Sequence, residues 1–188
     1  MRRIRGFSLI ELVVSGALFL VLCVAILSVY RAGLTTESVT AQRTILQDSL
    51  QTGMRVLDHE ISEASASLVT STSQSVTVQI PAFNVDGSPN GTYDYVTFAA
   101  SGSGLYQSVI PGINSERKAY SGKRVINYLP VPYPSPGLFS YWTRVDGNIQ
   151  QKLPVDATIV RVWLRQTAKY GNRTQNVELS QDIRMRNR

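Results

Sequence analysis

The chain has 188 residues, and its 19 lysines and arginines against 13 aspartates and glutamates give a formal net charge of +6. Charge is uneven: residues 37–116 hold two basic and eight acidic residues, whereas residues 117–188 hold thirteen basic and four acidic ones. The length suffices for one globular domain besides the apolar N-terminal run. A single cysteine, Cys23, excludes an intrachain disulfide, and a single histidine, His59, leaves a zinc site without enough ligands.

The N-terminus combines basic residues with a long apolar run. Three arginines lie within the first five residues, and no charged residue occurs from Leu12 to Tyr30. This run matches the roughly 20 residues that cross a bilayer as a helix. Because basic residues stay on the cytoplasmic side, we expect a single-pass protein of the inner (cytoplasmic) membrane whose C-terminal part lies outside the cytoplasm.

The junction between the basic and apolar parts lies at Gly6–Phe7, before the apolar run rather than after it as in a secretory signal. One carboxylate, Glu11, lies inside the apolar segment, where an ionisable side chain is costly and indicates function. The block Gly6-Phe-Ser-Leu-Ile-Glu11 resembles the class III signal of type IV pilins and type II secretion pseudopilins.

The resemblance implies a processing pathway. A prepilin peptidase would cut after Gly6 and methylate the new N-terminus at Phe7, so residues 1–6 form a leader peptide. Glu11 would then meet the N-terminal amine of a neighbouring subunit, which compensates a charge that would otherwise cost several kcal/mol in an apolar core. The implied partners are the peptidase, other major and minor pilins or pseudopilins, the inner-membrane assembly platform and membrane lipid. No cofactor is implied.

Apolar residues continue at helical spacing beyond the membrane run. They form one stripe, with polar residues mostly off it: Val39, Leu46, Leu50, Met54, Leu57, Ile61 and Leu68. We therefore predict one nearly continuous helix from Phe7 to about Ala66. Residues 7–30 are its transmembrane or filament-core part, and residues 31–68 its amphipathic part, whose stripe packs against a sheet.

Residues 69–188 have the texture of a β-rich domain. Short runs with alternating apolar residues predict strands over 76–80, 93–100, 105–110, 124–129, 139–144, 159–166 and 175–185. Ser101-Gly-Ser-Gly104 predicts a hairpin turn, as does Val145-Asp-Gly-Asn148. A long N-terminal helix packed against an antiparallel β-sheet is an α+β, pilin-like domain.

This element order resembles a narrower group. A long helix, several strands and a late hairpin ending in Asp182-Ile-Arg-Met-Arg-Asn187 resemble the PilW-type minor pilins and the J-type minor pseudopilins of type II secretion. The resemblance implies a structural, non-enzymatic subunit of a type IV pilus, a type II secretion system or a DNA-uptake (competence) filament. The alternative is an unprocessed, signal-anchored envelope protein.

No catalytic constellation is recognisable. Asp86-Gly-Ser-Pro-Asn90 resembles part of a calcium loop, but it lacks the repeated acidic positions and the distal glutamate, so we interpret it as a turn. No metal site is predicted.

The basic C-terminal third is the remaining functional signal. Its candidate contact residues are Arg161, Arg165, Lys169, Arg173, Arg184 and Arg186. Clustered basic side chains bind phosphates, so a DNA-binding or adhesive minor pilin is one interpretation. Complementarity with the acidic region 37–116 of another subunit is the other, and it is favoured. The tyrosines and tryptophans near these charges are expected in the core rather than as base-stacking platforms, except for Tyr170, whose position in a turn allows exposure.

Overall fold

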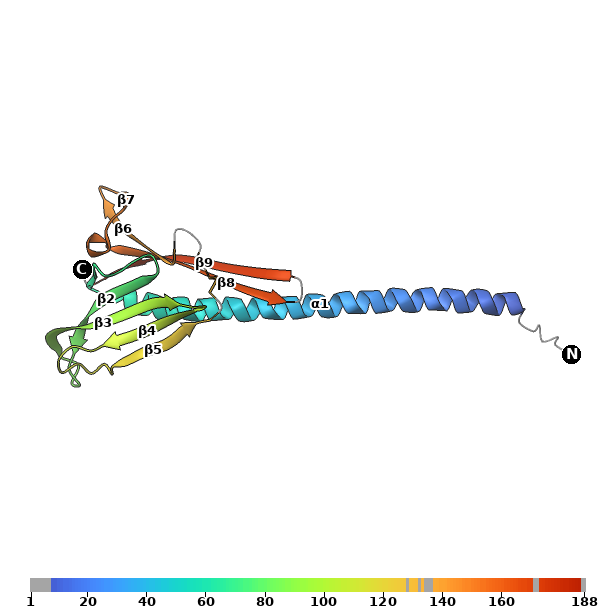
Figure 1. The fold of residues 1–188 in the computed structure, drawn as a ribbon, viewed down its shortest axis with the longest axis horizontal. Coiled ribbons are helices and arrows are strands. Elements are labelled where there is room, and N and C mark those ends of the chain that lie inside the picture. The colour runs from blue at the N-terminus through green and yellow to red at the C-terminus, as the bar shows by residue number, and fades with distance from the viewer. Residues whose placement is uncertain (1–7, 128, 132, 134–136, 171–172, 187–188) are drawn as a thin grey trace. The chain divides into compact units, whose positions relative to one another are not determined.

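The structure is a computed structural model that describes residues 8–127, 129–131, 133, 137–170 and 173–186. Its elements are α1 (Leu9–Ser62), β1 (Ala66–Ser67), β2 (Ser75–Phe83), β3 (Pro89–Ser101), β4 (Gly104–Ile110), β5 (Tyr120–Ile126), β6 (Phe139–Val145), β7 (Asn148–Gln151), a 3-10 helix η1 (Pro154–Asp156), β8 (Ile159–Tyr170) and β9 (Arg173–Arg184) (Figure 1). The chain divides into two units, Met1–Arg43 and Thr44–Arg188, which are described separately.

In the first unit, α1 begins with a capping box. The Ser8 hydroxyl accepts a hydrogen bond from the Ile10 amide at 3.3 Å, and the Glu11 carboxylate accepts one from the Ser8 amide at 3.0 Å. Ser and Glu at this spacing satisfy amide groups that the first helical turn leaves unpaired.

The helix ends at Ser62, a few residues before the end expected near Ala66. The reason is pairing with a strand far along the chain. The Ser65 amide donates to the Gln79 carbonyl at 2.8 Å, and Ala66 and Ser67 pair with Gln79 and Val78 of β2. A backbone committed to a sheet ladder cannot continue the helix.

The strands form two antiparallel sheets rather than the single sheet that was expected. Sheet A has the order β1-β2-β3-β4-β5 and sheet B the order β7-β6-β8-β9 (Figure 1). Four prolines lie in the sequence between β5 and β6, and proline lacks the N–H group that a sheet ladder requires. The α+β class, with one long helix packed against antiparallel strands, is confirmed.

Both predicted turns join strands. Ser101 pairs directly with Gly104 in the β3–β4 hairpin. Asp146 and Gly147 have φ values of 50° and 84°, as a type I′ turn requires, and they connect β6 to the short strand β7, which was not expected.

The core of the second unit lies between α1 and the two sheets. From Leu46 to Ile61 the predicted stripe is buried: Leu46, Leu50, Met54, Leu57 and Ile61 are at most 4% exposed. Two polar side chains tie the sheets together. The buried Tyr141 hydroxyl contacts the Thr72 and Ser75 carbonyls at 2.9 and 3.0 Å, and burial raises its pKa. Gln166 donates to the Ser49 hydroxyl at 3.0 Å and to the Asn127 carbonyl at 2.5 Å.

Close packing at Gly53 yields a first prediction. A Cβ atom there would overlap Cγ1 of Ile126, a fully buried residue of β5. Alanine improves helix propensity by about 1 kcal/mol. Overpacking costs about 1–3 kcal/mol, so Gly53→Ala should lower the free energy of unfolding by about 1 kcal/mol net. Urea unfolding of the full chain in detergent measures this change.

The control is the same substitution in an Ile126→Ala background, where the obstructing side chain is gone. There Gly53→Ala should be neutral or stabilising. An equal loss of stability in both backgrounds would contradict the packing explanation.

Candidate functional site

The N-terminal candidate residues are only partly described. Gly6 and Phe7, the predicted processing residues, lie outside the described residues. Glu11 lies in the first turn of α1 and accepts the Ser8 amide, so the predicted assembly residue also has a local role in starting the helix.

The segment after Glu11 exposes apolar side chains around the whole helix. Every large aliphatic or aromatic residue from Leu12 to Val29 is more than half exposed within this chain. Its helix is long and apolar enough to cross a membrane. A surface of this extent must be covered by lipid or by other helices.

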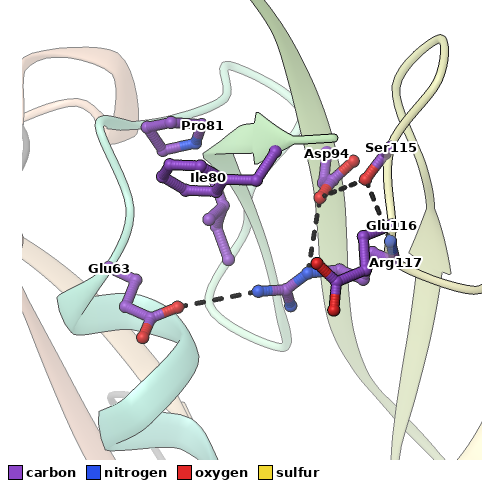
Figure 2. A pocket seen from close by; sticks show the side chains of 8 residues that line it. Glu63, Ile80, Pro81, Asp94, Ser115, Glu116 and Arg117 are labelled. Carbon is purple, nitrogen blue, oxygen red and sulfur yellow. Dashed lines mark hydrogen bonds and ion pairs between the residues drawn. The ribbon is translucent and has the colours of Figure 1, made fainter. Parts of the chain in front are cut away.

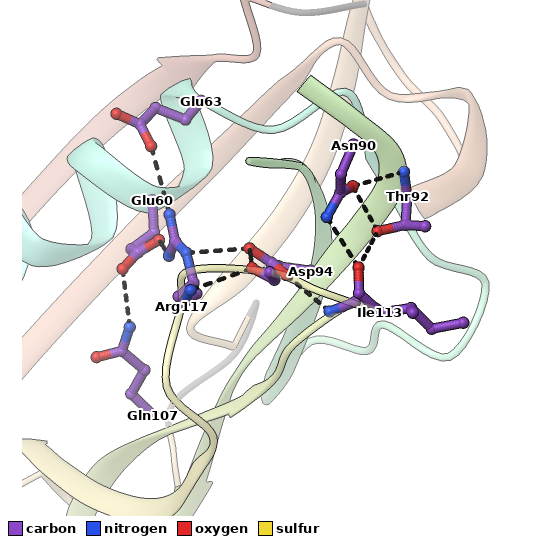
Figure 3. Close-up of polar contacts among 10 residues, drawn as sticks. Glu60, Glu63, Asn90, Thr92, Asp94, Gln107, Ile113 and Arg117 are labelled. Atoms are coloured by element: carbon purple, nitrogen blue, oxygen red, sulfur yellow. Dashed lines mark hydrogen bonds and ion pairs between the residues drawn. The ribbon is translucent and has the colours of Figure 1, made fainter. Parts of the chain in front are cut away.

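A second polar centre lies where α1 ends, and we call it the Arg117 cluster: Arg117, Glu60, Glu63, Asp94 and Gln107. Figure 3 shows the Arg117 guanidinium between carboxylates from α1 and β3. It lies 2.5 Å from Glu60, 3.6 Å from Glu63 and 3.4 Å from Asp94. Gln107 of β4 donates to the other oxygen of Glu60 at 3.1 Å.

Asp94 anchors the loop that carries Arg117. Its side chain is 3% exposed and accepts the Gly112 amide at 2.8 Å and the Ser115 hydroxyl at 3.0 Å. Burial alone would lower the pKa of Arg117, but the hydrogen bond to Glu60 and the negative charges of its carboxylate neighbours outweigh burial and raise it. The cluster therefore holds the β4–β5 loop against the end of α1.

A pocket of about 280 Å³ opens beside this cluster. Figure 2 shows that Ile80 and Pro81 form an apolar wall opposite Arg117. Arg117 already pairs with its carboxylate neighbours, and the described residues contain no group of histidine, cysteine and acidic side chains suited to a metal. The arrangement is that of a structural brace.

Sequence reasoning missed the Arg117 cluster, although one signal was present. Asp94 is in phase with Val96 and Phe98, which both face the core, so the alternation places a carboxylate on the buried face of β3. A buried carboxylate needs a cationic or hydrogen-bonding partner. That partner is 23 positions away in sequence, beyond any local pattern.

The predicted basic residues fall on β8, on β9 and just beyond β9. Arg161 makes two hydrogen bonds to Asp182, at 2.6 and 2.9 Å, and these lower the pKa of the Asp182 carboxyl. Arg165 forms an ion pair with Glu178 across the hairpin through one nitrogen of its guanidinium. Two of the six candidates are therefore neutralised by carboxylates of the neighbouring strand.

Both arginines cover tryptophans that were expected in the core. The guanidinium of Arg161 lies 4.8 Å from the ring centre of Trp142, and that of Arg165 lies 5.4 Å from Trp163. Both tryptophans are only half-buried on the outer face of sheet B, so that expectation was wrong. Arginine stacking shields the ring faces and stiffens this surface.

The other basic candidates are dispersed. Lys169 and Arg184 lie near opposite ends of the β8–β9 hairpin, and Arg186 follows β9, where its amide donates to the Ser62 carbonyl. All three are exposed, and none has an ion pair within the described part of the chain. The side chain of Arg173 lies outside the described residues. These side chains do not converge on one site.

The sequence matches no protein-family model, and no curated protein matches it. Among solved structures, a type IV-like pilin from Thermus thermophilus has a similar fold, with a TM-score of 0.52 and 11% sequence identity. The similarity covers 74% of this chain and 96% of that chain. The fold is pilin-like.

A pilin-like fold gives the two halves of α1 a common explanation. The amphipathic half carries the core stripe of the β-rich unit. The apolar half is exposed among the described residues, and it is long and apolar enough to cross a membrane.

Proposed function

We propose that the protein is a structural, non-enzymatic subunit of a pilin-type filament, a minor pilin or pseudopilin. The pilin-like fold carries this proposal, because it joins a β-rich unit to a helical segment whose large apolar side chains are exposed among the described residues. Before assembly that segment is covered by inner-membrane lipid, and afterwards by the corresponding helices of other subunits.

In this proposal the precursor is cut between Gly6 and Phe7 by a prepilin peptidase and methylated on Phe7. The leader arginines hold the N-terminus in the cytoplasm, so the unit from Thr44 to Arg188 lies outside it. The assembly platform extracts the subunit from the membrane, and Glu11 meets the amine of a neighbouring subunit. The Gly6–Glu11 block and the charge-free run after it support these steps.

Placement among the PilW-type minor pilins and J-type minor pseudopilins rests on the order of elements and on the residues after Asp182. A pilus, a secretion system and a DNA-uptake machine are all compatible with it. We do not extend the proposal to DNA binding, because Arg161 and Arg165 are committed to carboxylates and the other basic side chains are dispersed.

Mass analysis of the protein from its native membrane tests the proposal. The full chain should be recovered beginning at Phe7 with a methylated amine, and Gly6→Ala should accumulate uncut and stay out of filaments. Gly33→Ala is the matched control, because a Cβ atom there meets nothing within 4 Å, and it should be cut normally. A wild-type chain that keeps Met1 in cells with an active prepilin peptidase would contradict the proposal.

A further inference from the structure

The four outer strands of the two sheets differ in how open they are to pairing. β1 has two residues and β7 has four. β5 is interrupted by two register shifts, has Gly122 at a φ of 69° and carries Lys123 and Arg124. Short length, bulges and basic residues are the usual protection of a sheet edge against a further strand.

The edge formed by β9 has none of these protections along most of its length. The strand has twelve residues, contains no proline and pairs with β8 in unbroken register from Arg173 to Arg184. Its two acidic side chains, Glu178 and Asp182, are neutralised by arginines of β8. Only Arg184 contributes an unpaired charge to the described part of this edge, and it lies at the end.

Backbone groups on alternate residues of β9 face outward. The Met185 amide donates to the Thr158 carbonyl on the β8 side, which sets the phase of the antiparallel ladder. Odd-numbered residues of β9 therefore bond to β8. The even-numbered residues point their backbone groups to the free edge, and among the described residues these groups have no partner: Thr174, Asn176, Glu178, Ser180, Asp182 and Arg184.

The next outward amide shows what satisfies such a position. Arg186 is even-numbered, and its amide donates to the Ser62 carbonyl at the end of α1, at 2.9 Å. Among the described residues, the chain thus covers this edge only beyond Arg184.

The inner face of β9 is also incompletely covered. Val177 and Leu179 are half-buried, whereas their β8 partners, Gln166 and Leu164, are fully buried. A groove of about 210 Å³ lies beside Leu179, and it is lined by Met54 and by the polar side chains Gln51, Arg55, Asp58 and Gln181. An open edge with an adjacent pocket for alternate side chains is the arrangement by which sheets accept an extended peptide.

We propose that the free edge of β9 pairs with an extended strand of a neighbouring filament subunit, whose side chains on one face lie over the groove beside Leu179. A polypeptide strand is the occupant because only a backbone offers donors and acceptors at the spacing of the six outward residues. The neighbouring subunit as its source rests on the proposed function.

Residue-resolved hydrogen exchange of the full-length protein tests this pairing. In detergent-dispersed protein, the outward amides of Asn176, Glu178, Ser180 and Asp182 should exchange at least about tenfold faster than those of the odd-numbered residues of β9. In assembled filaments their exchange should slow by at least the same factor. The first comparison checks the phase of the ladder and the second checks the added strand.

Ser180→Pro removes one outward amide, and Ser180→Ala is its matched control, because it keeps the amide and removes the same hydroxyl. Proline should reduce incorporation into filaments, whereas alanine should not. Filaments whose outward β9 amides exchange as in the dispersed protein would overturn the pairing and leave the proposed function intact. A chain that never enters filaments would overturn both.

Discussion

Replacing Arg117 with methionine is expected to lower the free energy of unfolding by about 3 kcal/mol. Methionine retains the length of the side chain, but it leaves the carboxylates of Glu60 and Asp94 without their cation. Those side chains are 12% and 3% exposed, so water cannot replace the lost partner fully. The change is measured by urea unfolding of the full chain in detergent, followed through tryptophan fluorescence.

Arg161→Met is the matched control, because it removes one arginine from an exposed ion pair whose two members are each 40% exposed. Exposed pairs contribute at most about 1 kcal/mol. Equal losses for the two variants would show that the Arg117 cluster behaves as an ordinary surface pair. Such a result would contradict its role as a brace between α1 and the β4–β5 loop.

The contrast between these arginines also marks what a sequence can predict about this fold. The stripe from Leu46 to Ile61 and the Asp146–Gly147 turn are local patterns, because residues within a few positions determine them. The Arg117 cluster joins residues that are 23 to 57 positions apart. No pattern along the chain identifies the cation that a buried aspartate on β3 will meet.

The predicted end of the helix and the predicted single sheet were both wrong for the same reason, because each depends on contacts between residues far apart in the sequence. Ser62 through Leu68 has no residue that forbids a helix, and only the distant Gln79 carbonyl draws Ser65 into a ladder. Strand β7 is too short and too polar to be recognised, since its pairing depends on the preceding turn and on β6. Trp142 and Trp163 have largely apolar side chains, yet they lie on the outer face of sheet B. There the guanidinium groups of Arg161 and Arg165 stack on their rings.

The candidate functional residues also differ in whether local sequence identifies them. Glu11 could be selected as a candidate because an acidic residue at the start of a long apolar run is a local anomaly, and its role in assembly stays a prediction. The open edge of β9 could not be selected in this way, since recognising it requires knowing which strand ends the sheet and which other edges are protected. A binding surface that depends on the order of strands in a sheet therefore cannot be predicted from sequence until that order is known.

Glu11→Ala is expected to abolish entry into filaments while leaving cleavage after Gly6 unaffected. In an assembled filament the carboxylate would lie among apolar helices and compensate the amine of a neighbour's Phe7, and an uncompensated buried charge costs about 3–5 kcal/mol. The measurement is the fraction of the full chain found in sheared filaments, with intact mass reporting the cleavage.

Glu11→Ala alone does not separate the effect of the lost charge from other effects, because Glu11 has a second role in the structure. Its carboxylate completes the capping box with Ser8, and loss of a cap costs about 1 kcal/mol of helix stability. An assembly defect in Glu11→Ala could therefore arise from fraying of the first turn of α1.

Glu11→Gln separates the two roles, since glutamine serves in a capping box as glutamate does but carries no charge. If charge compensation is required, Glu11→Gln should lose assembly to the same extent as Glu11→Ala. Ser8→Ala is the converse control, because it removes the hydroxyl of the cap and keeps the carboxylate, and it should assemble. Wild-type assembly by Glu11→Gln together with failure of Ser8→Ala would assign Glu11 to helix capping and remove charge compensation from the mechanism.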